Sequence, residues 1–236
     1  MAISETTFAD RLQNGQNMQA AIAIFTPAFA PADTTLAPAA FLTFLDGLDT
    51  MNTDTGAAVA GYSTEVATRT AMVKDIKDRA GRALAYIKSN EAWKKYLPGI
   101  KSLVDKIRDN RPKAPKPPVA AEPPTSQPAK KRNKGEQSFG DIATNFAKLV
   151  AALGAVPGYA PPASAITIAN LTTASGAYDA QNATMGTLNI QVGLEQGDRA
   201  DGFVALRAKM KAIKEAVKSQ YGSSSAEYAQ VKGIDV

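Results

Sequence analysis

The sequence predicts an all-α fold, with two tandem repeats of an elongated three-helix bundle joined by a proline-rich basic linker. Three observations predict this fold class. Apolar residues recur every three or four positions through most of the chain, which is the period of an α-helix. The first part of the chain aligns with the last part, and between them lies a stretch dominated by proline and lysine.

The alignment of the chain with itself indicates an internal duplication. Residues 27–89 match residues 157–219 at a constant offset of 130 without a gap, and 12 of the 63 positions are identical. Upstream the offset is 131, where TFAD meets SFGD. The alternative is that two alanine-rich amphipathic helices have been slid into partial agreement. A shared Pro-x-aromatic-Ala-Pro turn, starting at Pro27 and Pro157, favours duplication.

The first helix of each copy is expected at residues 7–25 and 138–156. Thr7 and Ser138 are each followed three residues later by an aspartate, a variant of the capping box. The prolines at 27 and 157 end these helices, because proline cannot continue the hydrogen-bond ladder. Asp33 and Ser164 are candidate caps for the next helix.

A long second helix follows in each copy. Its apolar stripe steps by three and four through Phe41, Phe44, Leu48, Met51, Thr55, Ala58 and Tyr62, and through Leu171, Ala174, Tyr178, Gln181, Met185, Leu188 and Val192. We predict a break between residues 70 and 74. A third helix then folds back antiparallel, with its stripe at Ile76, Ala80, Ala83 and Ile87, and at Leu206, Met210, Ile213 and Val217.

Two polar sets recur in both copies. The first is Glu65 and Arg69, repeated as Glu195 and Arg199, at a spacing that suits a salt bridge along a helix. It is interpreted either as a partly exposed surface pair or as a buried pair that fixes helix register.

The second polar set is Asp49, Asn52 and Gly56, repeated as Asp179, Asn182 and Gly186. We expect each glycine to permit close helix approach, with the Asp and Asn hydrogen-bonding across it. One carboxylate per stripe is too few for an acidic metal site, and no metal is expected.

The chain is expected to divide into a first helical module at residues 1–110, a linker at 111–137 and a second module at 138–236. An extra amphipathic helix over residues 93–107 belongs to the first module, with Pro98 starting a new helical segment. Residues 111–134 carry seven basic side chains against one acid, a net charge of +6, whereas the whole chain has +5. The basic residues are Arg111, Lys113, Lys116, Lys130, Lys131, Arg132 and Lys134.

The composition argues against catalysis. Histidine and cysteine are both absent, which removes the commonest general base, the commonest metal ligands and every thiol nucleophile. No cofactor motif is present, so we expect a protein that is not an enzyme and binds no cofactor; carboxylate chemistry is the enzymatic alternative. The chain begins without a secretory signal, and no apolar stretch is long enough to span a bilayer, which predicts a cytoplasmic protein.

The openings TFAD and SFGD, the basic KKRNKGEQ and the ending VKSQYGSSSAEYAQVKGI resemble an uncharacterised family of bacterial two-repeat helical proteins. The resemblance implies the fold and no activity. The first functional hypothesis is a structural or scaffolding protein that self-associates into a homo-oligomer or ordered assembly. The second is a protein that binds nucleic acid or another polyanion through the basic linker. A solvated spacer remains the alternative role of that linker.

Overall fold

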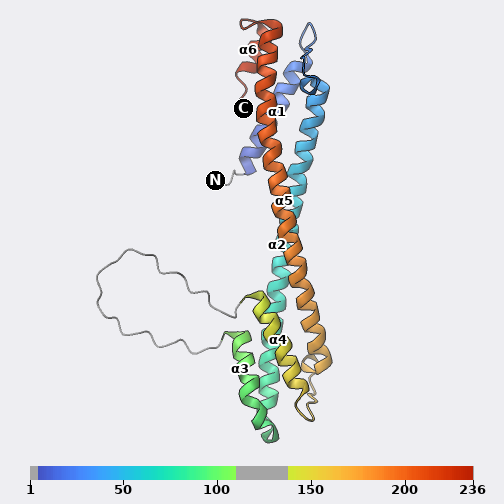
Figure 1. Cartoon of the computed structure of the whole chain (residues 1–236), viewed down its shortest axis with the longest axis vertical. Coiled ribbons are helices and arrows are strands. Elements are labelled where there is room, and N and C mark those ends of the chain that lie inside the picture. The colour runs from blue at the N-terminus through green and yellow to red at the C-terminus, as the bar shows by residue number, and fades with distance from the viewer. Residues whose placement is uncertain (1–4, 110–137, 236) are drawn as a thin grey trace, which may run out of the picture. The chain divides into compact units, whose positions relative to one another are not determined.

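The computed structural model describes residues 5–109 and 138–235, and within these ranges it contains helices and no strands. The all-α prediction is therefore confirmed. Figure 1 shows the chain. The α-helices are α1 (Glu5–Ala23), α2 (Pro38–Lys88), α3 (Leu97–Arg108), α4 (Phe139–Gly154), α5 (Ile168–Tyr221) and α6 (Ala226–Lys232), and the short 3-10 helices are η1 (Thr34–Leu36), η2 (Glu91–Tyr96) and η3 (Ser164–Ile166). The linker at 111–137, with its seven basic residues, lies outside the described residues.

Several helix starts follow the sequence signals. Ser138 and Asp141 form a reciprocal capping box at the start of α4. The Asp33 side chain accepts a hydrogen bond from the Thr35 amide and caps η1. Pro98 lies in the first turn of α3, where its missing N–H has no partner to lose.

Two of the predicted caps were wrong. Helix α1 begins at Glu5, so Thr7 lies inside the helix instead of capping it. Ser164 is the first residue of η3, and Ala163 holds the cap position. The carbonyl of Ser164 accepts hydrogen bonds from the side chains of Thr167 and Asn170, so Ser164 stabilises this turn through its backbone.

The predicted break between residues 70 and 74 was also wrong, and so was the third helix expected to fold back after it. Helix α2 is continuous from Pro38 to Lys88, and α5 is continuous from Ile168 to Tyr221. Residues 70–74 contain neither proline nor glycine, so every residue can continue the helical hydrogen-bond ladder. Met72 and Val73 are partly buried against an apolar core, which ties this part of α2 to tertiary packing.

The described chain forms two compact units that do not follow the order of the sequence. Unit 1 comprises residues 1–62 and 188–236, and unit 2 comprises residues 63–187. Each long helix therefore gives its first half to one unit and its second half to the other. The sequential division into modules at 1–110 and 138–236 does not coincide with these units.

Unit 1 packs α1, the first half of α2, the second half of α5 and α6 around one apolar core. Aromatic rings fill much of it, and Phe8 and Phe203 lie with ring centroids 4.7 Å apart. Burial of these side chains removes apolar surface from water and stabilises the unit. The core consists of Phe8, Leu12, Met18, Ile22, Phe25, Phe29, Leu36, Phe41, Leu45, Leu48, Phe203, Leu206, Met210, Ile213, Val217 and Val231.

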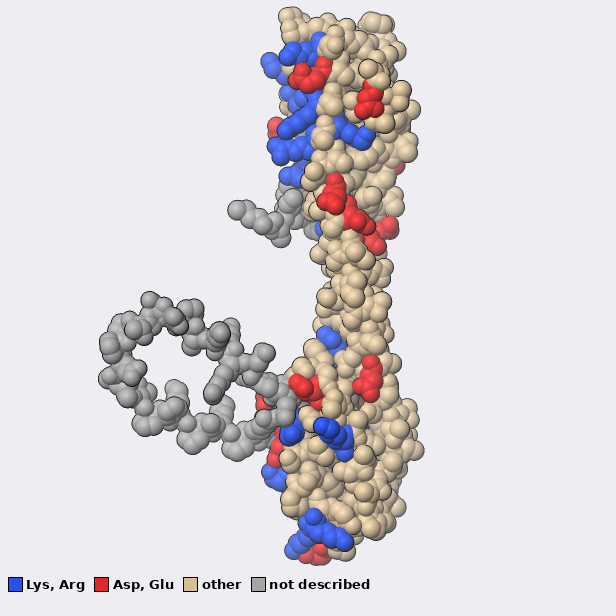
Figure 2. Space-filling view, in the orientation of Figure 1, with Lys and Arg blue, Asp and Glu red and all other residues tan. Residues whose placement is uncertain are grey.

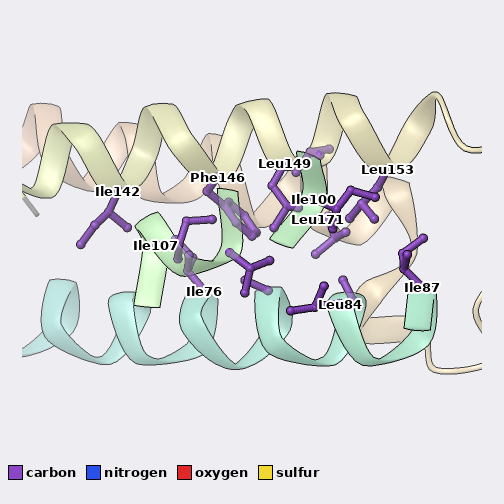
Figure 3. Close-up of a cluster of buried hydrophobic side chains, with 14 of the residues drawn as sticks. Ile76, Leu84, Ile87, Ile100, Ile107, Ile142, Phe146, Leu149, Leu153 and Leu171 are labelled. Carbon is purple, nitrogen blue, oxygen red and sulfur yellow. The ribbon is translucent and has the colours of Figure 1, made fainter. Parts of the chain in front are cut away.

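Unit 2 packs the second half of α2, η2, α3, α4 and the first half of α5 around a second core (Figure 3). Helices α3 and α4 contact each other directly. Their apolar faces meet α2 and α5 over Ile76, Ala80, Ala83, Leu84, Ile87, Trp93, Ile100, Val104, Ile107, Ile142, Ala143, Phe146, Leu149, Val150, Leu153, Val156, Leu171 and Tyr178. Among the helices described here, none has an apolar stretch that could cross a bilayer.

Candidate functional site

Most of the polar residues that recur at an offset of 130 lie where the two long helices meet within each unit, and Asp49 and Asp179 are the exceptions. In unit 2 they form a group with residues of α4 and α5, which we call the unit 2 polar cluster. In unit 1 they form a group with α1, which we call the unit 1 polar cluster. The unit 2 polar cluster is Glu65, Arg69, Phe139, Tyr178, Gln181 and Asn182, and the unit 1 polar cluster is Phe8, Thr55, Glu195 and Arg199. Asn52 is half-buried on α2, and its Oδ1 atom has no hydrogen-bond partner among the described residues.

In unit 2, Glu65 and Arg69 bind different partners rather than each other. The Nε2 atom of Gln181 donates to Oε2 of Glu65 at 2.7 Å and joins α5 to α2. The guanidinium carbon of Arg69 lies 3.7 Å from the ring centroid of Phe139 on α4. The amide group of Asn182 donates to the Phe139 carbonyl at 3.4 Å. Three helices are thus tied together at one level of the unit.

Burial controls the electrostatics of this cluster. It raises the pKa of the Tyr178 hydroxyl, while the neighbouring Asn182 side chain and the Arg69 charge act in the opposite direction. The Nε atom of Arg69 is buried and has no hydrogen-bond partner among the described residues. The contact with the Phe139 ring therefore supplies part of the stabilisation that Arg69 loses with its water.

Unit 1 repeats the contact between an arginine and a phenylalanine. The guanidinium carbon of Arg199 on α5 lies 4.4 Å from the ring centroid of Phe8 on α1. Arg199 is only 6% exposed, so the contact is more deeply buried than the one in unit 2. The Thr55 hydroxyl contacts the carbonyls of Met51 at 2.7 Å and Glu195 at 3.2 Å, which joins α2 to α5.

The expected close helix approach at the recurring glycines was wrong. A Cβ atom at Gly56 or Gly186 would meet nothing within 4 Å. Asp49 and Asp179 are exposed, and no group of three or more acidic side chains in the described ranges could hold a metal ion. Close approaches occur instead at Gly15 of α1, where a Cβ atom would lie 2.7 Å from Leu45, and at Gly202 of α5, where it would lie 2.6 Å from Leu48. Gly15 falls on the apolar stripe of α1, which is a signal that the sequence did contain.

A second group of contacts, missed from the sequence, holds the turns that precede the long helices. In unit 2 the indole N–H of Trp93 donates to the Pro157 carbonyl, and the Tyr86 hydroxyl donates to the Ala160 carbonyl, each at 3.0 Å. The Tyr159 hydroxyl donates to the Ile166 carbonyl at 2.9 Å. Burial, with a smaller effect of Tyr86, raises the pKa of Tyr159 to about 12, so this hydroxyl keeps the proton that it donates even at a pH where an exposed tyrosine ionises.

In unit 1 the corresponding turn is held by the end of α5. The side chain of Gln220 accepts from the Ala30 amide and donates to the Ala28 carbonyl, both at 2.9 Å. The Tyr221 hydroxyl donates to the Pro27 carbonyl. Both turns are thus fixed by residues distant in sequence.

These contacts join helices and contain no pairing of a nucleophile with a base. No family model, curated protein or solved structure matches this chain. The function proposed below therefore rests on the residues of this chain alone.

The two arginine–phenylalanine contacts lead to a prediction about stability. We expect double-mutant cycles with Arg→Met and Phe→Leu to give a coupling of about 0.5–1 kcal/mol for Arg69 with Phe139, and about 2 kcal/mol for Arg199 with Phe8. The second value is larger because Arg199 is more deeply buried. Urea unfolding of the four variants in each cycle measures both couplings. Equal couplings, or none, would contradict the role given to the rings.

Proposed function

We propose that this chain is a non-enzymatic structural or scaffolding protein that self-associates through its helical units. The observation that supports this proposal is an exposed apolar stripe on the second half of α5. Ile190, Leu194 and Val204 are 65%, 64% and 68% exposed. We call these three residues the outer stripe.

The spacing of the outer stripe is that of a helix-packing face. Ile190, Leu194 and Val204 share one face of α5, because positions 190, 194, 197, 201 and 204 advance in alternating steps of four and three. Gly197 and the exposed Asp201 occupy the two positions between Leu194 and Val204, so the apolar side chains lie at the two ends of this face. The opposite face of the same helix buries Phe203 and Leu206 in the core of unit 1. Pairing of the outer stripe with a second copy would remove this surface from water, at about 1–2 kcal/mol for each side chain.

The test is the oligomeric state of the full chain. We expect the wild-type mass, measured by size-exclusion chromatography with light scattering, to rise above the monomer with concentration. The triple variant Ile190→Gln, Leu194→Gln, Val204→Gln should remain a monomer, because the stripe can no longer bury apolar surface. A wild-type chain that stays monomeric at millimolar concentration would contradict the proposal.

A matched control lies on α2. Ala60, Ala67 and Ala71 are exposed, and two of them stand 130 residues before Ile190 and Gly197. Their replacement by glutamine adds the same polar side chains to a long helix without touching the outer stripe. This control should associate as the wild type does.

We also propose that the chain arose by duplication of one helical unit and that the copies exchange the halves of their long helices. The supporting observation is that η1 and η3, and likewise α2 and α5, begin 130 residues apart. The Arg69–Phe139 and Arg199–Phe8 contacts each join one copy to the other, which is what an exchange produces. Membership of the bacterial two-repeat family is part of the same proposal.

A second candidate function is binding of nucleic acid or another polyanion. The net charge of +6 on residues 111–134 motivates this candidate, and α5 carries further basic side chains. Arg207, Lys211 and Lys218 are exposed, and Figure 2 shows basic side chains gathered over the end of α5. A monomeric wild-type chain that bound duplex DNA with a steep salt dependence would favour this candidate over self-association.

A further inference from the structure

We propose that a groove in unit 2 binds a small planar aromatic molecule that carries a hydrogen-bond donor. The groove lies between α2 and the start of α5 and has a volume of about 490 Å³. This volume is in the range of small-molecule sites. Its apolar lining is Met72, Ile76, Ala174 and Ala177, and its charged lining is Asp75 and Arg79. The proposal does not depend on self-association.

The corresponding place in unit 1 shows what the groove can hold. Phe44 is the seventh residue of α2, and Ala174 is the seventh residue of α5. The Phe44 ring stacks on Phe41 with centroids 6.3 Å apart, and the ammonium group of Lys209 lies 5.3 Å from its centroid. A ring beneath a cation thus occupies this position in unit 1, whereas unit 2 has only a methyl group there.

The cations of the two units hold equivalent places. Lys209 donates to the hydroxyl of Thr35 in η1 at 3.1 Å, and Arg79 donates to the carbonyl of Ala165 in η3 at 2.7 Å. Thr35 and Ala165 are the middle residues of their turns. Because each cation is placed by the same turn, the missing ring in unit 2 leaves its space beside Arg79.

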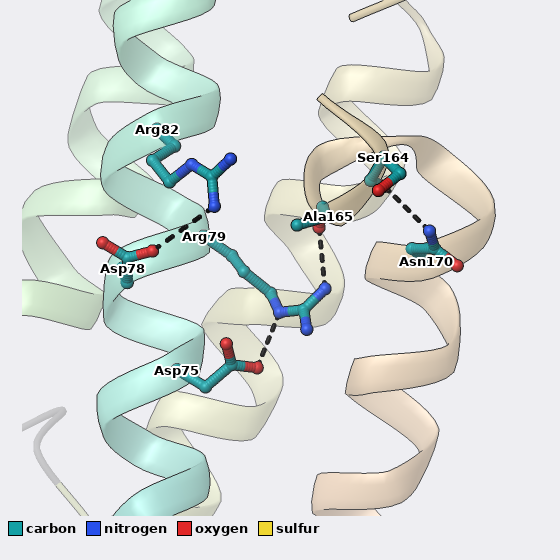
Figure 4. A network of polar contacts seen from close by, with 7 residues as sticks. All are labelled: Asp75, Asp78, Arg79, Arg82, Ser164, Ala165 and Asn170. Carbon is teal, nitrogen blue, oxygen red and sulfur yellow. Dashed lines mark hydrogen bonds and ion pairs between the residues drawn. The ribbon is translucent and has the colours of Figure 1, made fainter. Parts of the chain in front are cut away.

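The geometry of Arg79 suits a flat partner. Its Nε atom donates to Asp75 at 2.6 Å, and Nη1 donates to Ala165, as Figure 4 shows. Hydrogen bonds lie in the guanidinium plane, so they fix that plane and leave its face for stacking. The side chain is 21% exposed, and partial removal from water strengthens the attraction between a cation and the negative face of an aromatic ring.

The rim of the groove explains the need for a donor on the ring. The Asp75 side chain is 50% exposed, so its carboxylate remains accessible beside the groove. The Asn170 amide group is engaged with the Ser164 carbonyl at 2.8 Å (Figure 4). That bond uses the NH2 group of Asn170, so the acceptors at the rim are the Asn170 amide oxygen and the charged Asp75 carboxylate, and the carboxylate is the stronger acceptor for an N–H or O–H on the ring. Indole and phenol meet both requirements.

The test uses the full chain and indole as the probe, followed by amide chemical shifts in NMR spectra. We expect indole to shift the amides of groove residues in unit 2, and cyclohexanol, a ring without a π face, to bind at least about fivefold more weakly. Ala174→Phe should abolish the shifts, because the new ring fills the groove as Phe44 does in unit 1. Arg79→Lys keeps the charge but loses the flat face, and should weaken indole binding about threefold.

A matched gain-of-site variant completes the experiment. Phe44→Ala should open the equivalent space beneath Lys209 and add indole-dependent shifts in unit 1, with weaker binding than in unit 2 because Ala205 stands there in place of Asp75. Circular dichroism of each variant reports whether its helices are retained. Unchanged indole binding in Ala174→Phe, equal binding of indole and cyclohexanol, or no shift with indole or phenol would each overturn the proposal. Tighter binding of N-acetyl-tyrosinamide than of indole would replace the small molecule with a side chain of a partner protein.

Discussion

Replacement of Ala71 by proline is expected to destabilise the protein by about 3 kcal/mol or more. Position 71 lies in the interior of α2, where proline removes one backbone hydrogen bond and its ring collides with the preceding turn. The Ala71 side chain is exposed, so the loss comes from the backbone and not from core packing. Urea unfolding followed by far-ultraviolet circular dichroism measures the change.

The control for this prediction is Ala71→Gly, which keeps the N–H and should cost only about 1 kcal/mol. The pair of variants separates the continuous helix from the break that the sequence pattern predicts between residues 70 and 74. At a real break, proline would be tolerated as well as glycine. A proline variant as stable as the glycine variant would show that α2 is interrupted at this point.

The wrong prediction of a break has a physical cause in the exchange of partners. Residues 38–62 of α2 face the core of unit 1, and residues 63–88 face the core of unit 2. Between these two parts the stripe passes through Glu65 and Arg69, whose partners are Gln181 and Phe139, so the apolar pattern is interrupted although the helix is continuous. An interrupted apolar stripe looks the same in the sequence whether the helix continues with new partners or ends. The absence of proline and glycine over residues 70–74 was the local signal that distinguished them.

Local signals were correct at three places and failed at the caps expected at Thr7 and Ser164. The capping box at Ser138, the cap at Asp33 and the proline in the first turn of α3 all depend on residues within a few positions. The fold class was predictable for the same reason, since an apolar period of three to four residues requires a helix.

Contacts that depend on tertiary neighbours could not be predicted in this way. Glu65 and Arg69 have the spacing of a salt bridge, but Gln181 and Phe139 from other helices are their observed partners. The spacing within one helix contains no information about the side chains that a second helix brings. The groove beside Arg79 is similar, because the sequence aligns Phe44 with Ala174 but only the fold brings Arg79 and the turn at Ala165 beside that position.

We expect residues 1–110 and residues 138–236, produced as separate chains, to fold only when they are combined. The core of unit 1 needs α1 and the first half of α2 together with Phe203, Leu206 and Ile213 of α5. Without these residues, the first chain leaves the apolar faces of α1 and α2 in water. The second chain leaves the apolar faces of α4 and α5 in water, because α2 and α3 complete the core of unit 2.

Each chain alone should therefore show low helicity or nonspecific association, with no cooperative unfolding transition as a monomer. An equimolar mixture should regain the helical spectrum and a cooperative transition, since both cores are then complete. The intact chain cleaved within residues 111–137 is the control, and its two parts should remain associated. A cooperatively folded monomer of either separate chain would mean that each long helix completes its core within its own half, which contradicts the exchange between units.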